Sequence, residues 1–312
     1  MEKRFVTPLA RSLAEKLGIN IDLVKGTGPG GRVMREDVIA FSKNPQPTPA
    51  APAPAASVAP IQQTPATPNP VAASSTSETL SGKVEKVAPI RKAIARAMKN
   101  SWSSVAYVNL VNEIDVTNLW YLRKKVVEDI QKTTGLKITF LSFISKAILI
   151  ALQEFPILAA KYDEATESLV YPSTINLGIA VDTDAGLMVP VIKDAQNLSM
   201  VQIGLEINRL AKAARERKIK ASEMSGGSFT ITNYGSVGAL YGVPVINFPE
   251  IAIAGVGAIQ SNVRWVNGQA TEGKVMHLTV AADHRWVDGG TIGRFISRVK
   301  ELLEKPEILG II

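Results

Sequence analysis

The chain of 312 residues contains no cysteine and only two histidines. The lack of cysteine excludes disulfides, thiolate metal sites and a cysteine nucleophile, and it fits a reducing compartment. The histidines, His277 and His284, are seven residues apart along an expected strand, so their side chains face opposite ways. The sequence therefore predicts no zinc site.

Long apolar runs are also scarce. The most apolar stretch, residues 140–155, contains Lys146, is followed by Pro156 and is too short to span a bilayer. The first ten residues have no apolar core of a secretion signal. We therefore expect a buried helix at 140–155 and an intracellular, cytoplasmic protein.

Motifs for several other functions are missing. The net charge is +7, but the basic residues are spread out, aromatic residues make up only 6%, and no nucleic-acid motif accompanies them. No G-x-S-x-G elbow is present. The loop GTGPGG (26–31) has the glycine spacing of a dinucleotide fingerprint, but proline-rich sequence follows it instead of a long helix. Tight turns explain these glycines better than nucleotide binding does.

Composition divides the chain into three parts. Residues 44–79 contain nine prolines, nine alanines and one charged residue. Such a segment cannot bury enough surface to fold. We predict a linker over 44–83, between a small module over 1–43 and a large domain over 84–312.

Hydrophobic periodicity predicts the elements of both folded parts. In the module, Pro8 opens a helix with apolar Leu9, Leu13 and Leu17, Gly18 ends it, and a second helix covers 35–41. The large domain alternates the two periodicities, which predicts an α/β domain with a mixed sheet. Its expected helices cover 89–101, 116–132, 140–155, 201–219 and the stretch from 290 onward, and its expected strands cover 105–114, 176–182, 187–192, 227–233, 250–260 and 274–283.

The stretch AADHRWVDGG (281–290) holds the main candidate for chemistry. His284 stands where a strand gives way to two glycines, and the ends of strands are common places for reactive side chains. The residue pattern alone leaves a structural and a catalytic role open for His284. Asp288 is expected to cap the helix that follows.

Several ordered motifs resemble one family. DHRWVDGG fits the His-x-x-x-Asp-Gly signature of chloramphenicol acetyltransferase-like acyltransferases. The segments IRKAIARAMKNS, NLGIAVDTDAGLMVPVIKDA, GGSFTITNYGSVG and PVINFPEIAIAGVGAI resemble the dihydrolipoamide acyltransferases of 2-oxo acid dehydrogenase complexes, and most of all those of pyruvate dehydrogenase complexes. Residues 6–41 resemble the peripheral subunit-binding domain. The resemblance implies a small all-α domain before an α/β catalytic domain with a chloramphenicol acetyltransferase-like mixed sheet.

The resemblance also implies an activity, the transfer of an acetyl group between dihydrolipoamide and CoA. His284 would be the general base on the thiol, and the Thr232 hydroxyl would donate to the tetrahedral oxyanion. Asp288 would hold the architecture of the site. Family positions along a CoA channel fall on Arg123, Thr139, Asp182, Asn233, Gly257 and Ile259.

Partners follow from the same resemblance. Such catalytic domains form trimers with active sites between subunits, and the trimers build larger cores, to which the apolar end ILGII would contribute. Arg11 and Arg32 of the module match positions that meet acidic surfaces on the pyruvate dehydrogenase (decarboxylase) or dihydrolipoamide dehydrogenase component. The module has eight Lys/Arg against five Asp/Glu, which suits electrostatic docking.

The sequence departs from the family pattern in some places. No lipoyl domain precedes the module, so the lipoyl group is expected from another chain or from a domain not contained in this sequence. Trp286 is bulkier than the usual aliphatic residue, Ala281 stands where serine is frequent, and SVAY (104–107) replaces a Pro-His pair. These last three changes all fall near the expected site.

Two alternatives of other classes stay open. A non-catalytic assembly scaffold would not need His284, Thr232 and Asp288 together. A free-standing acyltransferase for a small alcohol or amine would not need the module and linker. Within the favoured family, succinyl and branched-chain acyl groups would use the same chemistry as acetyl.

Overall fold

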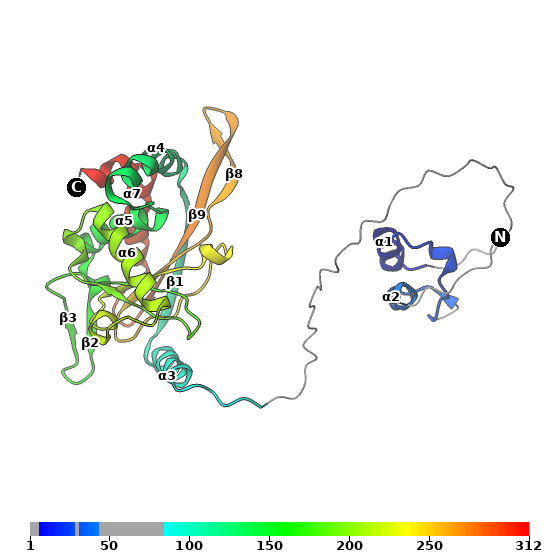
Figure 1. Cartoon of the computed structure of the whole chain (residues 1–312), viewed down its shortest axis with the longest axis horizontal. Helices are drawn as coiled ribbons and strands as arrows, with labels where there is room; N and C mark the ends of the chain where they lie inside the picture. Colours follow the sequence, from blue (N-terminus) through cyan, green and yellow to red (C-terminus); the bar gives the residue numbers. More distant parts are fainter. Residues whose placement is uncertain (1–5, 29–30, 44–83, 312) are drawn as a thin grey trace, which may run out of the picture. The chain divides into compact units, whose positions relative to one another are not determined.

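The computed structural model describes residues 6–28, 31–43 and 84–311. The chain divides into two compact units, Met1–Thr79 and Leu80–Ile312, each with its own hydrophobic core (Figure 1). The expected linker over 44–83 lies outside the described residues. Among the described helices, none is both long enough and apolar enough to cross a membrane.

The small unit consists of α1 (Pro8–Lys16), a short 3-10 turn (Ile21–Leu23) and α2 (Arg35–Lys43). Pro8 occupies the first helical position, and the Thr7 hydroxyl accepts a hydrogen bond from the main-chain N–H of Ala10. The expected apolar stripe is confirmed only at Leu13, which packs against the core, and is wrong at Leu9 and Leu17, which are exposed while Ala10 and Ala14 are buried. The core of this unit consists of alanines and valines, so α1 turns its small side chains inward.

The large unit contains a seven-stranded mixed sheet, as expected. The strands lie in the order β1-β9-β7-β6-β4-β5, and β8 pairs with β9 beside this path. β6 runs parallel to β4 and β7, and the other neighbours are antiparallel. The bounds are β1 Tyr107–Asp115, β4 Leu177–Ile179, β5 Val191–Ile192, β6 Phe229–Asn233, β7 Ala252–Val256, β8 Gln260–Val266 and β9 Gln269–Asp283.

Helices cover one face of this sheet. They are α4 (Thr117–Thr134), α5 (Phe140–Glu154), α6 (Met200–Arg215) and α7 (Gly289–Glu304), and nine residues of α5 are buried, which confirms the expected buried helix. Alternate residues of β7, such as Ala252 and Ala254, belong to the main core on this helix-covered face. Ile253 between them belongs to a small cluster on the opposite face, which we call the open face.

The helix α3 (Pro89–Ser104) packs less tightly than its apolar periodicity suggests. Of the five expected apolar positions, Ile94 and Met98 are half-buried, whereas Ile90, Ala93 and Ala97 are exposed. The apolar stripe predicted the helix correctly, but contacts within this chain cover only part of the stripe.

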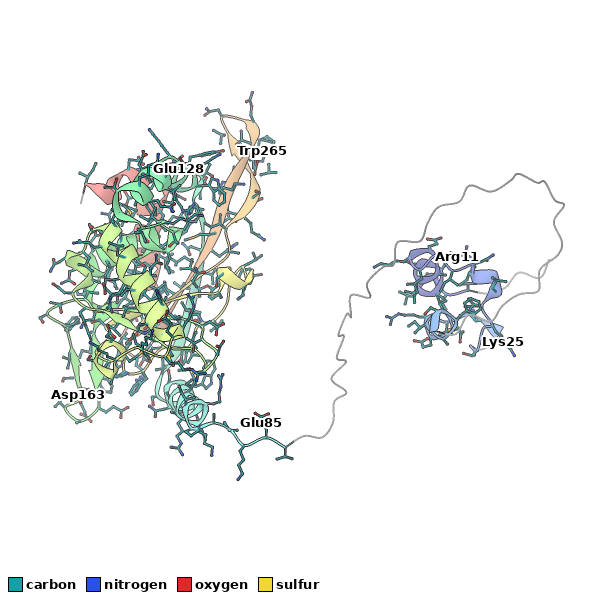
Figure 2. The ribbon with its side chains drawn as sticks, viewed as in Figure 1. Arg11, Lys25, Glu85, Glu128, Asp163 and Trp265 are labelled. Atoms are coloured by element: carbon teal, nitrogen blue, oxygen red, sulfur yellow. The ribbon has the colours of Figure 1, made fainter. Side chains whose placement is uncertain are left out.

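The strands β8 and β9 form a long ribbon that extends beyond the rest of the large unit (Figure 1). Trp265 lies near its tip (Figure 2). Val263 and Trp265 are 65% and 76% exposed. The sequence analysis missed β8, although Asn267 and Gly268 at the turn both have positive φ, as a tight hairpin requires. The Asn-Gly pair between two extended runs was the available signal.

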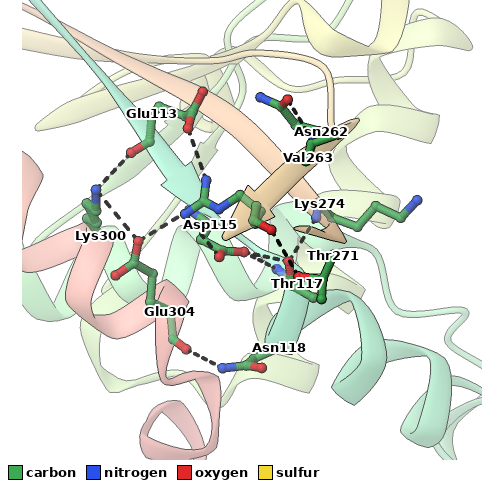
Figure 3. A network of polar contacts seen from close by, with 11 residues as sticks. Glu113, Asp115, Thr117, Asn118, Asn262, Val263, Thr271, Lys274, Lys300 and Glu304 are labelled. Carbon is green, nitrogen blue, oxygen red and sulfur yellow. Dashed lines mark hydrogen bonds and ion pairs between the residues drawn. The ribbon is translucent and has the colours of Figure 1, made fainter. Parts of the chain in front are cut away.

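Polar contacts join this ribbon to the body of the unit (Figure 3). The Arg264 guanidinium on β8 pairs with Glu113 and Asp115 of β1, with N···O distances of 3.0 Å in both pairs. The Thr117 hydroxyl at the start of α4 donates to Asp115 and accepts from the main-chain N–H of Lys274 on β9. The ribbon therefore leaves the sheet at a defined place.

Candidate active site

His284 lies in the turn directly after β9. Its main-chain N–H donates to the carbonyl of Ala106 at 2.7 Å, which fixes the backbone at this point. The residue is exposed, and no hydrogen bond joins its imidazole to another described residue. The imidazole is therefore available to an incoming thiol.

Asp288 stands at the N-cap of α7, as its spacing predicted. The expected capping bond is absent, because the Asp288 carboxylate accepts no hydrogen bond from the first turn of α7. The main-chain carbonyl of Asp288 accepts instead from the N–H groups of Thr291 and Ile292. The side chain is exposed on the same turn as His284.

Thr232 lies near the end of β6, half-buried, on the open face of the sheet. It lines a cavity of about 370 Å³. Its partner across the strands is Gly255, and the Tyr234 ring lies where a side chain at Gly255 would stand. Other members of the wall are Met98, Leu187, Val189, Tyr241 and Val243. A hydroxyl in a largely apolar cavity suits donation to a developing negative charge.

Thr232 and His284 are far apart within one chain. Thr232 pairs with Gly255, Gly255 pairs with Thr279, and His284 follows Thr279 by five residues. At about 3.3 Å per residue and about 4.8 Å between strands, the separation is about 16 Å along the strands and about 10 Å across them. The two side chains of a single chain cannot act on one acyl group.

Three of the expected CoA residues line one cavity. Asn233, Gly257 and Ile259 lie around a space of about 260 Å³ at the ends of β6 and β7, on the helix-covered face. Trp120 of α4 and Phe140 of α5 form its aromatic wall, with ring centroids 5.2 Å apart. The sequence analysis missed both aromatic residues, which no motif distinguishes from core residues.

Arg123 and Thr139 both lie next to Phe140, which lines this cavity. The Arg123 Nε donates to the carbonyl of Ile138 at 2.9 Å, and the guanidinium lies 4.9 Å from the centroid of the Phe140 ring. Arg123 is therefore not a freely solvated helix charge. Thr139 is the N-cap residue of α5, and its hydroxyl makes no capping bond.

Asp182 stands apart from both cavities. It is exposed in the hairpin between Val181 and Met188, which bridge each other, and it belongs to neither cavity wall. The structure therefore does not bring Asp182 into a site with the other expected CoA residues of the same chain.

The second histidine, His277, belongs to β9. Its ring lies edge-on to Tyr241, with centroids 5.5 Å apart. Among the described residues, no group of three or more His, Asp or Glu side chains could hold a metal ion. This contact places His277 beside the wall of the Thr232 cavity, to which Tyr241 belongs.

A buried carboxyl lies next to the Thr232 cavity, and the sequence analysis missed it. Glu250 is 3% exposed, and burial raises its pKa to about 7. It accepts hydrogen bonds from the Thr230 hydroxyl at 2.7 Å and from the Asn247 side-chain amide at 3.1 Å. Thr230 and Asn247 both line the cavity, so Glu250 supports its wall from behind.

In the small unit, Arg11 lies exposed on α1 (Figure 2). Arg32, after the glycine loop, is also exposed. The loop is shaped by Asp37, whose carboxylate accepts from the N–H and hydroxyl of Thr27 and from the N–H of Met34. These bonds lower the pKa of Asp37. Residues 29 and 30 of the loop lie outside the described residues.

Comparison with protein families gives two matches along the chain. Residues 80–311 match the catalytic domain of the 2-oxoacid dehydrogenases acyltransferase family, and residues 4–39 match the e3 binding domain. The two matched stretches cover the large unit and most of the described part of the small unit.

Individual proteins are similar over nearly the whole chain. The dihydrolipoyllysine-residue acetyltransferase component of the pyruvate dehydrogenase complex from Acholeplasma laidlawii is 41% identical over 98% of this chain, which spans 56% of that protein. The corresponding component from Staphylococcus aureus strain Mu50 is 40% identical over 97% of this chain and 70% of its own length.

A solved structure extends the similarity to the fold. The cubic core of the pyruvate dehydrogenase multienzyme complex superposes with a TM-score of 0.70 at 28% identity, over 81% of this chain and 99% of that one.

Proposed function

This chain belongs to the 2-oxoacid dehydrogenase acyltransferase family, and we propose that it transfers an acetyl group between dihydrolipoamide and CoA within a pyruvate dehydrogenase complex. We assign residues 1–43 to partner binding, 44–83 to a linker and 84–312 to catalysis. The observation that carries the proposal is the exposed His284 imidazole, held on a fixed turn inside a family-specific motif.

His284 begins the reaction as a general base. Imidazole takes up and releases protons near neutral pH, so it can accept the proton of the CoA thiol as the sulfur attacks the acetyl thioester. The new carbon–sulfur bond turns the carbonyl oxygen into an oxyanion, to which the Thr232 hydroxyl donates. Collapse breaks the old carbon–sulfur bond, and the departing lipoyl sulfur takes the proton back from His284. The same steps run in reverse.

Two subunits are needed for one site. Because strand geometry separates Thr232 and His284 by well over the span of a thioester, we assign the two roles to neighbouring copies of the chain in a homotrimer. The apolar residues around the Thr232 cavity and the exposed Val263 and Trp265 of the ribbon provide surfaces for such contacts. Ile311, 82% exposed beside the chain end, would serve contacts between trimers in a larger core.

The residues beside the second cavity fit CoA. Its aromatic and aliphatic wall suits the uncharged arm of CoA, and the Asn233 side chain adds a polar group that can donate or accept. The Arg123 guanidinium next to Phe140 adds positive charge for the phosphates. We keep Asp182 and Thr139 as CoA residues in this proposal, Asp182 on the basis of the motif alone. A lipoyl domain on another chain, or one outside this sequence, would supply the second thiol.

The first experiment measures acetyl transfer from acetyl-CoA to free dihydrolipoamide by the wild type and by His284→Ala. Loss of a general base lowers kcat by about 10²- to 10⁴-fold. The control is His277→Ala, which changes the only other histidine and should keep most of the activity. A His284→Ala enzyme with wild-type kcat would remove His284 from the mechanism.

The same assay tests the alternatives. Succinyl-CoA and isobutyryl-CoA take the place of acetyl-CoA, and a higher kcat/KM with either one would change the acyl group in the proposal. A wild type that is inactive with all three, yet assembles with its partners, would favour the scaffold.

The small unit is proposed to dock the pyruvate dehydrogenase or dihydrolipoamide dehydrogenase component. Arg11 and Arg32 would meet acidic groups on those enzymes, so Arg32→Ala should weaken binding about tenfold at low salt and by less at high salt. Titration calorimetry at two salt concentrations measures this change. Equal binding by wild type and Arg32→Ala at low salt would show that another face of the unit docks.

A further inference from the structure

Asp283 organises the turn that carries His284. Its side chain is 4% exposed, and its Oδ1 accepts from the main-chain N–H groups of Ala106 at 3.3 Å and Arg285 at 3.1 Å. Its main-chain carbonyl accepts from Trp286 and Val287, both at 3.0 Å. The residues on both sides of His284 are therefore held by one buried carboxylate and its own backbone.

Arg285 compensates the charge of this carboxylate. The Arg285 Nη2 lies 2.7 Å from Oδ2 of Asp283, and Nε lies 3.0 Å from both carboxylate oxygens. A two-pronged contact of this kind fixes the guanidinium plane as well as its distance. Because the carboxylate is almost fully buried, removal of Arg285 would leave an uncompensated charge under the His284 turn.

Two aromatic rings confine the guanidinium. Tyr162 and Trp286 stack with ring centroids 4.4 Å apart, and the Arg285 guanidinium carbon lies 5.4 Å and 5.3 Å from these two rings. Trp286 packs against the main core. Tyr162 comes from β2 (Lys161–Asp163), which forms a separate hairpin with β3 (Ser168–Val170).

The hairpin is joined to the sheet beside the turn. Lys161 bridges Glu250, and the carbonyl of the next residue, Ile251, accepts from the N–H of Asp283 at 2.9 Å. Tyr162 is therefore placed against Trp286 by a backbone connection that reaches Asp283 itself. The turn is held from the sheet side and from the hairpin side.

We propose that Tyr162, Asp283, Arg285 and Trp286, which we call the Arg285 cluster, position the His284 imidazole for proton transfer. None of the four needs to touch a substrate, so these are positioning residues. This inference rests on the proposed function for its kinetic effect, because it assigns the cluster to the same general base. Its structural part, a fixed His284 turn, can be tested without any activity.

The kinetic experiment measures kcat and KM in full-length Arg285→Met and Tyr162→Leu, with acetyl-CoA and dihydrolipoamide. Misplacement of a catalytic group by about 1 Å can cost about 10²-fold, so we expect kcat to fall about 10- to 100-fold in Arg285→Met and about 3- to 10-fold in Tyr162→Leu. KM for acetyl-CoA should stay within about twofold, because none of the four residues lines the CoA cavity. Arg285→Lys, which keeps the charge, should restore part of kcat.

A matched control separates positioning from general loss of an ion pair. Arg298 of α7 contacts both carboxylate oxygens of Glu154 through Nε, at 2.9 and 3.1 Å, and is likewise partly exposed. Arg298→Met should leave kcat unchanged. Arg285→Met leaves the buried Asp283 carboxylate without its counter-ion, which disfavours folding. The double variant Asp283→Asn/Arg285→Met removes both charges of this pair and provides a second test if the single variant fails to fold.

Chemical modification provides the readout that does not depend on activity. Diethyl pyrocarbonate modifies accessible neutral imidazoles, and the chain contains only two, so peptide mass spectrometry follows His284 and His277 separately. In Tyr162→Leu the modification rate of His284 should rise at least about threefold while that of His277 stays constant, since only the His284 turn is loosened. Wild-type kcat in both variants, or equal acceleration at both histidines, would overturn the inference. An inactive wild type with the selective change at His284 would contradict the proposed function alone.

Discussion

The two faces of the central sheet differ in what covers them. The helix-covered face packs against α4, α5, α6 and α7 and holds the main hydrophobic core. The open face has a four-residue cluster, Val105, Ile246, Ile253 and Ala281, and a cavity with exposed apolar residues in its wall. Helices of the same chain cover the first face. On the second face apolar side chains stay exposed, and in the proposed trimer a neighbouring subunit would cover them.

Several buried polar groups lie on the side of the open face, whereas Ser142 and Ser145 of α5 lie on the helix-covered side. Thr230, Glu250 and Thr279 lie behind or on the open face and have hydrogen-bond partners. The helix-covered face is built almost entirely of aliphatic and aromatic side chains. The proposed oxyanion donor Thr232 lies on the open face, which is incomplete in a single chain, whereas the cavity proposed for CoA lies on the helix-covered face.

The largest expected effect comes from mixing two inactive variants. If the open face of one subunit receives His284 from its neighbour, Thr232→Ala and His284→Ala should each be nearly inactive alone. Refolded together at equal amounts, they should recover about a quarter of the wild-type activity, because about one interface in four then combines an intact His284 with an intact Thr232. The assay is acetyl transfer after co-refolding. No recovery in trimers shown to be mixed would place both residues in one chain's site.

The next prediction compares how much unfolding free energy is lost when one side chain is truncated on each face. Phe295 of α7 is fully buried, with Phe155 and Phe229 each at a centroid distance of 6.0 Å, so Phe295→Ala should cost about 3–5 kcal/mol of unfolding free energy. Val243 on the open face is 58% exposed, and Val243→Ala should change the stability of a subunit by less than about 0.5 kcal/mol. Urea unfolding measures both. A large loss for Val243→Ala in dissociated subunits would show that the open face has more internal packing than its exposure indicates.

The smallest effect concerns pH and Glu250. Burial raises the pKa of this carboxyl to about 7, so the folded chain holds the proton that the unfolded chain has released. The stability that this proton gives is complete below the ordinary glutamate pKa of about 4.5 and is lost as pH rises through about 7. Glu250→Gln stays neutral and should be more stable than the wild type at pH 8 by about 1–3 kcal/mol, with little difference at pH 4.5. Equal pH dependence of thermal unfolding in both proteins would contradict this assignment.

Much of the fold followed from periodicity. The long helices at 140–155 and 201–219 were expected within a few residues of α5 and α6, because many side chains repeat the same apolar spacing there. The strands β2, β3 and β8 were missed, although each pairs with a neighbour in sequence, because β2 and β3 are only three residues long and the side chains of β8 are mostly exposed. On α1 only Leu13 of the three expected leucines packs against the core, whose buried contribution from this helix consists of Ala10 and Ala14.

The sequence identified individual residues of the candidate site but not how they are arranged. The motif DHRWVDGG singled out His284 and Asp288, and TITN singled out Thr232 and Asn233. Strand alternation already places the adjacent Thr232 and Asn233 on opposite faces of the sheet, but nothing in the sequence could show that each face has a cavity at this point. The roles of Glu250 and Tyr162 could not be seen in the sequence, because that of Glu250 depends on its burial in the fold and that of Tyr162 on its stacking against the distant Trp286.

The sequence by itself determined the mixed α/β class and the chemistry-bearing motifs, and it predicts a module, a linker and a large domain. These are local properties, since composition, side-chain period and short motifs can be read without knowing what lies nearby. The tertiary structure decided which side chains meet: the burial of Glu250, the cluster around Arg285 and the separation of Thr232 from His284. Strand register sets that separation, and register results from pairings between distant segments, which no single stretch of sequence contains.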